Sequence, residues 1–130
     1  MRNTCRVSHT FSHTISRKDL RWFRLWRVHR QLNRREDVYQ LFLRRGYLQT
    51  FGCETCRNPY LQHLLKITPK NLILAETDNP TAEPWLGGTD TSINLIEKIY
   101  ADIAEILEMS VGELEKVIFE NGKRVLRGNW

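Results

Sequence analysis

The sequence predicts an α/β fold built from parallel βα units. Two observations lead to this prediction: short apolar runs have the length of strands, and the segments between them repeat their apolar residues at helical spacing. From residue 37 onward the order is helix, strand, helix, strand and helix. Strands that alternate with helices favour a parallel sheet, because a parallel connection needs a crossover that is usually a helix.

The first half of this pattern has clear boundary signals. A helix is predicted over residues 37–45, with Gly46 as its C-terminal stop, and a strand follows through Phe51. Asn58 before Pro59 is typical of a helix start. The side chains expected to face the core from these two helices are Val38, Leu41, Phe42, Leu61, Leu64 and Leu65.

The second half begins with a strand predicted over residues 72–75. A longer helix then carries apolar residues at helical spacing, and the run from Ser110 to Glu113 has the pattern of a capping box that opens the last helix. The apolar positions of the longer helix are Ile93, Ile96, Ile99, Ile103 and Leu107.

Positive charge is concentrated in the N-terminal third. Residues 1–45 carry a net charge of +9, whereas residues 46–130 carry −4. Basic and apolar residues over 17–32 predict a basic amphipathic helix. Its Arg and Trp side chains are suited to the phosphates and bases of nucleic acid, or to an anionic membrane. A non-catalytic binding module acting through Arg17–Arg35 is therefore one functional hypothesis.

The cysteines and the hydropathy pattern concern the cellular setting. The three cysteines are an odd number, and no secretory signal precedes them, which favours a reducing, cytoplasmic setting. No transmembrane segment is predicted, because no stretch approaches the roughly 20 apolar residues that span a bilayer. Cys53 and Cys56 form a CxxC, for which a chance occurrence is favoured over a zinc or redox site.

The run from Leu72 to Pro80 is the strongest candidate for a functional site. An apolar strand ends there in Glu76 and Asp78, which share one face if the backbone stays extended. Loops beyond the carboxyl ends of parallel strands commonly carry catalytic groups, and a carboxylate there can reach a metal ion or a proton. The alternative is a simple turn, since Asp and Asn favour turns through local hydrogen bonds.

Three ordered motifs from Gly46 onward carry a family resemblance. The segments 46–52 (GYLQTFG), 74–80 (LAETDNP) and 120–126 (ENGKRVL) resemble the C-terminal part of the TatD-type metal-dependent deoxyribonucleases of the amidohydrolase superfamily. The resemblance implies a (β/α)8, or TIM-type, barrel of which this chain supplies only the last βα units, because a whole barrel needs roughly 250 residues. It divides the chain into a divergent basic segment, 1–35, and a barrel part, 36–130.

The resemblance also implies a function and a set of residues. The reaction would be metal-dependent hydrolysis of a phosphodiester, most simply in DNA, with Mg²⁺, Mn²⁺ or Zn²⁺ as cofactor. Asp78 would be a metal ligand and help activate the attacking water, and His29 and His9 would be further ligands. Thr77, Asn79 and Pro80 would shape the loop, and Trp85 would line the cleft. A histidine on a basic helix is the alternative interpretation of His29.

Two motifs of that family do not occur in this chain. The family's first strand carries an HxH metal pair and a later strand a GExGLD glutamate, and neither is present. A truncated form that lacks these metal ligands is therefore expected. Loss of activity in this chain alone is one further hypothesis, and a degraded or frame-shifted origin for the basic segment is another. An incomplete barrel would also expose unpaired sheet edges, which predicts self-association.

Overall fold

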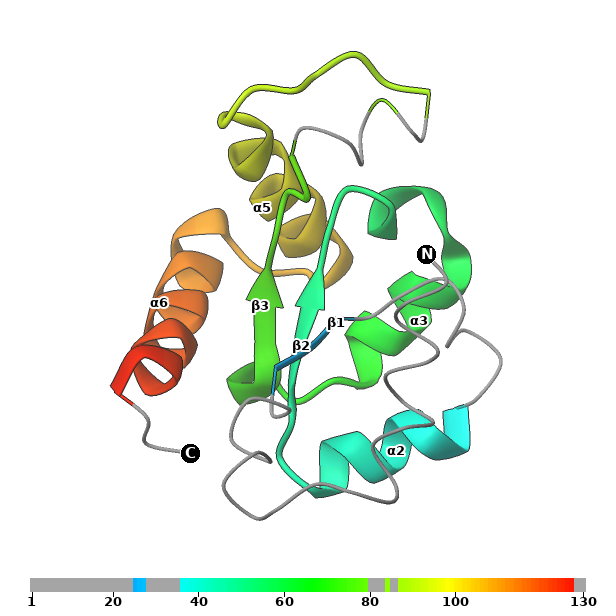
Figure 1. The fold of residues 1–130 in the computed structure, drawn as a ribbon, viewed down its shortest axis with the longest axis vertical. Coiled ribbons are helices and arrows are strands. Elements are labelled where there is room, and N and C mark those ends of the chain that lie inside the picture. The colour runs from blue at the N-terminus through cyan, green and yellow to red at the C-terminus, as the bar shows by residue number, and fades with distance from the viewer. Residues whose placement is uncertain (1–24, 28–35, 80–83, 85–86, 128–130) are drawn as a thin grey trace.

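The computed structural model describes residues 25–27, 36–79, 84 and 87–127. The described chain forms a parallel sheet with strand order β1-β2-β3, and helices pack on it (Figure 1). The strands are β1 (Leu25–Arg27), β2 (Leu48–Phe51) and β3 (Ile73–Ala75). The helices are α2 (Glu36–Arg44), α3 (Pro59–Ile67), α5 (Leu95–Ile106) and α6 (Val111–Arg127), with the 3₁₀ turns η3 (Thr55–Arg57) and η4 (Lys70–Leu72).

The predicted α/β class with parallel βα units is confirmed. Helix α2 separates β1 from β2, and α3 separates β2 from β3, so each parallel pair is joined by a helical crossover. A closed barrel is not formed by the described residues. The structure therefore shows βα units of the kind that a barrel repeats, and the rest of a barrel is implied by the family alone.

The basic helix predicted over 17–32 is wrong where the structure describes it. Residues 25–27 form strand β1, which pairs with β2 from Leu25 opposite Leu48 to Arg27 opposite Thr50. The other residues of 17–32 lie outside the described ranges. The error has a physical cause: a three-residue strand is defined by hydrogen bonds to a distant partner, which local periodicity does not report.

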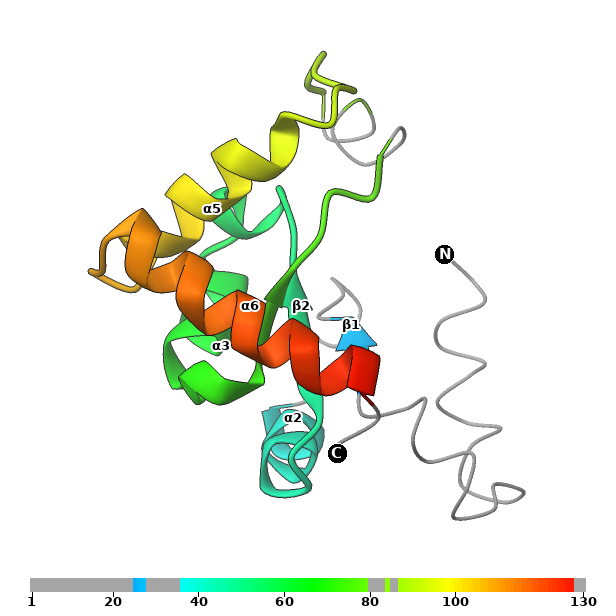
Figure 2. The same ribbon diagram turned by 90° about the vertical axis from the view of Figure 1, so that its left-hand side faces the viewer.

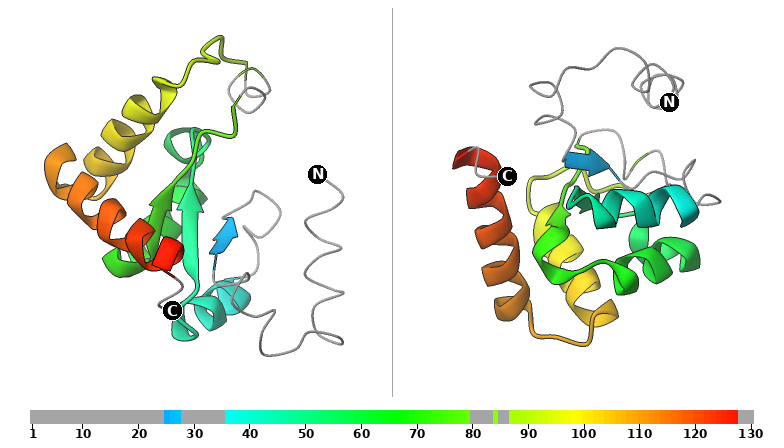
Figure 3. Two further views of the ribbon diagram at one scale, coloured as in Figure 1. Left: turned by 60° about the vertical axis from the view of Figure 1, so that its left-hand side comes forward. Right: turned by 90° about the horizontal axis from the view of Figure 1, so that it is seen from below.

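The core lies between the sheet and its helices. Side chains from β2, β3 and every described helix meet in one apolar cluster, and α3, α5 and α6 lie on one side of β2 and β3 (Figures 2 and 3). The predicted Leu61, Leu64 and Leu65 are at most 1% exposed, which confirms the stripe of α3. Ile93 is instead 82% exposed, because α5 begins only at Leu95. The core therefore fixes α3 and α5 against β2 and β3.

Helix α2 ends in a Schellman motif, as Gly46 predicted. Gly46 has a φ of 73°, and its amide donates to Leu43 O at 3.0 Å. The amide of Tyr47 donates to Phe42 O at 3.0 Å, and the two rings stack with centroids 5.5 Å apart. These bonds satisfy carbonyls that the helix end leaves unpaired. The motif directs the chain from α2 straight into β2.

The buried face of α2 differs from the predicted one. Leu41 is 38% exposed, whereas Tyr39 is 2% exposed and lies in the core. Tyr39 can be buried because its hydroxyl lies 2.5 Å from Thr68 Oγ1. The only hydroxyl proton of Thr68 goes to Leu64 O at 2.7 Å, so Tyr39 must be the donor of the first bond. Because its hydroxyl is hydrogen-bonded, Tyr39 can occupy the core position that was predicted for Leu41.

Tyr39→Phe is expected to lower the free energy of unfolding by about 1 kcal/mol at neutral pH, the usual net value of one buried hydrogen bond. Burial raises the pKa of Tyr39 above its ordinary value, with the Thr68 bond acting in the opposite direction. The Tyr39 contribution is therefore complete below about pH 10, the pKa of an unfolded tyrosine, and is lost as the pH rises above it. Urea unfolding from pH 7 to 11 checks this: the wild-type advantage should shrink, and a constant difference would contradict it.

The predicted start signals of α3 and α6 are both confirmed. Asn58 Oδ1 accepts the amides of Tyr60 and Leu61 at 3.0 and 3.3 Å. At α6, the amide of Glu113 donates to Ser110 Oγ at 3.2 Å, and the Ser110 amide donates to the Glu113 carboxylate at 2.9 Å. Hydrogen bonds from Ser110 hold the pKa of the Glu113 carboxyl below its usual value. Local capping chemistry therefore sets where both helices begin.

The end of α5 uses a residue that is poorly suited to its place. Glu108 has a φ of 54°, in the left-handed region. The amide of Met109 donates to Ala104 O at 3.0 Å and that of Glu108 to Glu105 O at 3.1 Å, which is again a Schellman arrangement. Glycine is the usual residue at this position, because a side chain there costs about 1–2 kcal/mol.

Glu108→Gly is therefore expected to raise the free energy of unfolding by about 0.5 kcal/mol. The relief of about 1–2 kcal/mol of backbone strain is offset by the larger entropy loss of glycine on folding, about 0.5–1 kcal/mol. Thermal unfolding measures the effect. Ala101→Gly is the matched control, since Ala101 is exposed in the middle of α5 and glycine there should cost about 1 kcal/mol. A destabilising Glu108→Gly would refute this account of the α5 end.

Helix α6 is fastened to the amino end of β3 by a buried amide. The Asn121 side chain is 3% exposed, and its Nδ2 donates to Lys70 O at 2.9 Å and to Ile73 O at 2.7 Å. Arg124 Nη2 donates to Asn121 Oδ1 at 3.1 Å and also bonds Asn71 O. The 120–126 motif therefore has a structural role in this fold, at the end of β3 opposite to the loop that carries Asp78.

Strand β3 is an edge strand of the described sheet. The amide of Glu76 donates to a carbonyl of β2 at 3.0 Å, so Leu74 and Glu76 turn their backbone groups toward β2. Ile73 and Ala75 consequently turn theirs toward the outer edge, where Asn121 already bonds the Ile73 carbonyl. Self-association through this edge stays a prediction, and the edge that it would use is short.

Candidate functional site

The candidate site lies where β2 and β3 end side by side (Figure 1). The bond from the Glu76 amide to Phe51 O continues the ladder one residue beyond β3. Gly52 faces this extension closely, because a Cβ at that position would lie 3.3 Å from Glu76 O and 3.7 Å from Glu76 Cγ. A glycine therefore lets the two strand ends approach, and the chain leaves β3 along a defined path.

Asp78 is half-buried and has a left-handed backbone, with a φ of 54°. An extended strand would place Glu76 and Asp78 on one face, but the left-handed residue interrupts the alternation. The expectation of a shared face therefore does not extend to Asp78. Aspartate adopts this conformation more readily than most residues with a side chain, since its short polar group can bond locally.

Asn79 holds the loop that follows. Its amide donates to Thr77 Oγ1 at 3.2 Å, so the acceptor of this local bond is a threonine hydroxyl and not the Asp or Asn side chain of the alternative interpretation. Its Nδ2 donates to Ser92 O at 2.5 Å, across 13 residues. Ser92 in turn donates through its amide and hydroxyl to Asp90 Oδ1, at 2.8 and 2.7 Å. The Ser92 and Asp90 contacts were not predicted, although Asp90 two residues before a serine is a recognisable turn signal.

The two predicted histidine ligands, His29 and His9, lie outside the described residues, as does Trp85. In the sequence, His29 follows the last residue of β1 by two positions, as Asp78 follows the last residue of β3 by three. Parallel strands end at the same edge of a sheet. The observed β1 therefore gives His29 a strand-end position in the sequence, which the helical interpretation did not.

The oxygen atoms near Asp78 are of the type that binds divalent cations, but the described residues supply too few of them to complete a site. Asp78 offers a carboxylate, and the neighbouring Asn79 carries a buried Oδ1 with no hydrogen-bond partner in the part of the chain that the structure describes. Hard cations prefer such oxygen ligands. Among the described residues, however, no three His, Cys, Asp or Glu side chains come together to hold a metal ion. Asp78 alone does not complete a site.

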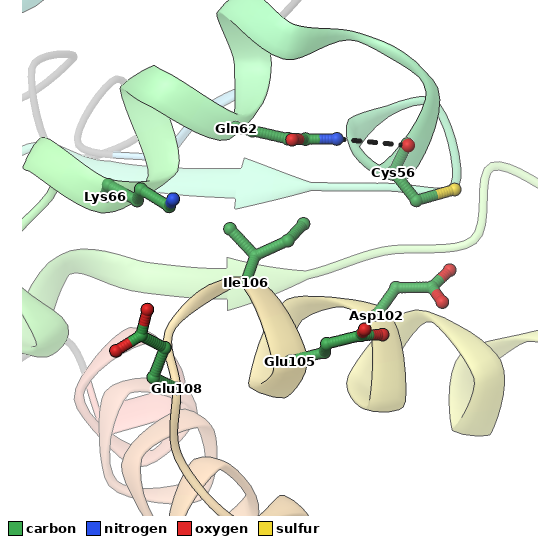
Figure 4. A pocket seen from close by; sticks show the side chains of 7 residues that line it. All are labelled: Cys56, Gln62, Lys66, Asp102, Glu105, Ile106 and Glu108. Carbon is green, nitrogen blue, oxygen red and sulfur yellow. Dashed lines mark hydrogen bonds between the residues drawn. The ribbon is translucent and has the colours of Figure 1, made fainter.

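A separate pocket of about 340 Å³ lies between α3 and α5, and Asp78 is not among its lining residues (Figure 4). Cys56 lines it, and its thiol donates to Cys53 O at 3.2 Å. Burial, with Asp102 beside the thiol, raises the pKa of Cys56. A protonated thiol is neither a strong nucleophile nor a good metal ligand, so the raised pKa does not favour a redox or metal role for Cys56. The other lining residues are Gln62, Lys66, Glu105, Ile106 and Glu108.

Parallel βα units with a carboxylate just beyond a strand end define a class of α/β proteins that carry their functional groups at the carboxyl edge of the sheet. Comparison with known proteins identifies the family within this class. The TatD related DNase family matches residues 22–127. The chain belongs to this family, as the three motifs indicated.

A curated relative gives a second comparison. The chain is 31% identical over 77 residues to the "Uncharacterized metal-dependent hydrolase MG009" of Mycoplasma genitalium. The match covers 57% of this chain and 29% of that protein, so the chain spans less than a third of the relative's length. None of the helices in the described ranges has the length and apolar character needed to cross a membrane.

Proposed function

We propose that this chain contributes Asp78 to the divalent-metal site of a TatD-type hydrolase that cleaves phosphodiesters, with DNA as the substrate. The observation that carries the proposal is the place of Asp78, just beyond the carboxyl end of a parallel strand, in a chain whose residues 22–127 match the TatD related DNase family. The relative's name, a metal-dependent hydrolase, supports the same class of reaction.

Each proposed residue has a distinct task. When bound, a divalent ion supplies a water of lowered pKa and polarises a phosphoryl oxygen. Asp78 would hold the ion through its carboxylate and accept the proton of the attacking water. His29, placed in the sequence just after β1, and His9 would be further ligands. Mg²⁺, Mn²⁺ and Zn²⁺ are all compatible with a set of carboxylate and imidazole ligands.

The binding-module hypothesis finds no support in the described structure. Residues 25–27 pair in the sheet, and the family match begins at residue 22, inside the basic segment. These residues therefore take part in the fold. The positive charge of the segment is still suited to a polyanionic substrate, since clustered Lys and Arg attract phosphate backbones.

The test is cleavage of single- and double-stranded DNA by the purified full chain, beside Asp78→Asn, with each of Mg²⁺, Mn²⁺ and Zn²⁺ and with a chelator. Cleavage that requires a metal and disappears in the variant is the expected result. A folded wild-type chain that cleaves no DNA with any of the three ions would show that this chain does not build the active centre by itself, and the proposal would then fail for the isolated chain.

A further inference from the structure

One side chain joins the loop after β3 to the start of α5. Asn79 Nδ2 donates to Ser92 O at 2.5 Å. The same carbonyl accepts the amide of Leu95, the first residue of α5, at 3.2 Å, and the Leu95 side chain is completely buried in the core. The loop is therefore attached to an element that core packing already fixes.

The chemistry of this contact fixes the orientation of the Asn79 amide. Ser92 O can only accept, so the atom that faces it must be Nδ2, and Oδ1 points elsewhere. Ser92 is itself held by two bonds to Asp90 Oδ1, and these bonds keep the pKa of the Asp90 carboxyl below its usual value. The acceptor of the Asn79 amide is thus a carbonyl with a fixed position.

The attachment of Asn79 stabilises the backbone conformation of the preceding residue, Asp78. Asp78 has a left-handed backbone, which costs a residue with a side chain about 1–2 kcal/mol. Such conformations persist when the surroundings impose them. Asn79 is held through its backbone by Thr77 Oγ1 and through its side chain by Ser92 O, so the peptide that follows Asp78 is fixed from two directions.

We propose that Asn79 is a positioning residue: by binding the Ser92 carbonyl in the turn that leads into α5, it holds Asp78 in the left-handed conformation and so directs the Asp78 carboxylate at the carboxyl edge of the sheet. The functional part of this inference rests on the proposed metal site. Asn79 need not touch the ion for this role. Its loss would act on metal affinity through Asp78.

Asn79→Asp is the sharpest test, because it keeps the size of the side chain and puts a carboxylate oxygen against the Ser92 carbonyl. Ser92→Ala is the matched control, since it removes the hydroxyl bond to Asp90 but keeps the amide bond to Asp90 and the carbonyl that Asn79 binds. The first measurement needs no metal: an NMR spectrum of the full chain, in which a left-handed Asp78 gives a strong Overhauser effect between its own amide and Hα protons. We expect this signal in the wild type and in Ser92→Ala and its loss in Asn79→Asp.

The second measurement is the Mn²⁺ concentration that broadens the Asp78 amide signal. It should rise by about tenfold or more in Asn79→Asp, as for other groups that orient a metal ligand. A left-handed signal that survives Asn79→Asp, or is missing from the wild type, overturns the inference. Loss of that signal in the variant, together with no Mn²⁺ broadening in the wild type, supports the positioning role and counts against the proposed metal site instead.

Discussion

Asp78→Asn is expected to reduce metal-dependent DNA cleavage by at least about 100-fold, with the thermal midpoint of unfolding unchanged. Loss of a group that only orients a metal ligand already costs about 10- to 100-fold in affinity or activity, and Asp78 is proposed to be the ligand itself. Asparagine is the right replacement, because it has the same shape and also tolerates a φ of 54°. The variant thus removes the charge and keeps the backbone.

A second substitution at the same position separates activity from backbone strain. Asp78→Gly relieves the left-handed conformation and also removes the carboxylate, so it should be inactive and no less stable than the wild type. DNA cleavage and thermal unfolding, measured on both variants, check the pair of expectations. Cleavage retained by either variant would mean that Asp78 is not a ligand of the reacting ion.

Asn121→Ala is expected to lower the free energy of unfolding by about 3 kcal/mol. The substitution removes the two hydrogen bonds to the carbonyls of Lys70 and Ile73, each worth about 1 kcal/mol net, and leaves these carbonyls without the donor that they share. It also removes the acceptor of the Arg124 side chain. This loss is a large fraction of the 5–15 kcal/mol by which domains are usually stable. Urea unfolding measures it. Glu120→Ala is the control, since Glu120 pairs only with Lys123 among the contacts described and is 64% exposed.

Asn121→Asp extends this test to pH. A carboxylate of the same shape cannot donate to the two carbonyls and repels them, although Arg124 Nη2 at 3.1 Å from Oδ1 offsets part of the cost. The carbonyls and the burial should raise the pKa of the introduced carboxyl above its unfolded value of about 4. The variant should therefore be closest to the wild type at or below pH 4 and lose stability as the pH rises. A pH-independent difference would contradict the assigned contacts.

Local signals predicted much of the fold. Gly46 marked the end of α2, Asn58 the start of α3, and Ser110 with Glu113 the start of α6, because each acts through bonds to backbone groups a few residues away. Strand β1 was missed because its definition depends on pairing with β2, more than 20 residues later.

The candidate site was predictable in part for the same reason. The place of Asp78 beyond a strand followed from the sequence, since an apolar run that ends in carboxylates is a local pattern. Its left-handed backbone and the contact of Asn79 with Ser92 did not follow. They depend on how the start of α5 returns to the end of β3, which is a property of the assembled tertiary structure.

The bond from Asn121 to the Ile73 carbonyl also gives the outer edge of β3 a register. A polypeptide that adds to this edge as a further strand finds the Ile73 acceptor already in use and meets the outward amide and carbonyl of Ala75 first. Pairing would thus start near the end of β3 that leads to Asp78. Through Asn121, helix α6 thus limits the registers in which a further strand can pair with β3.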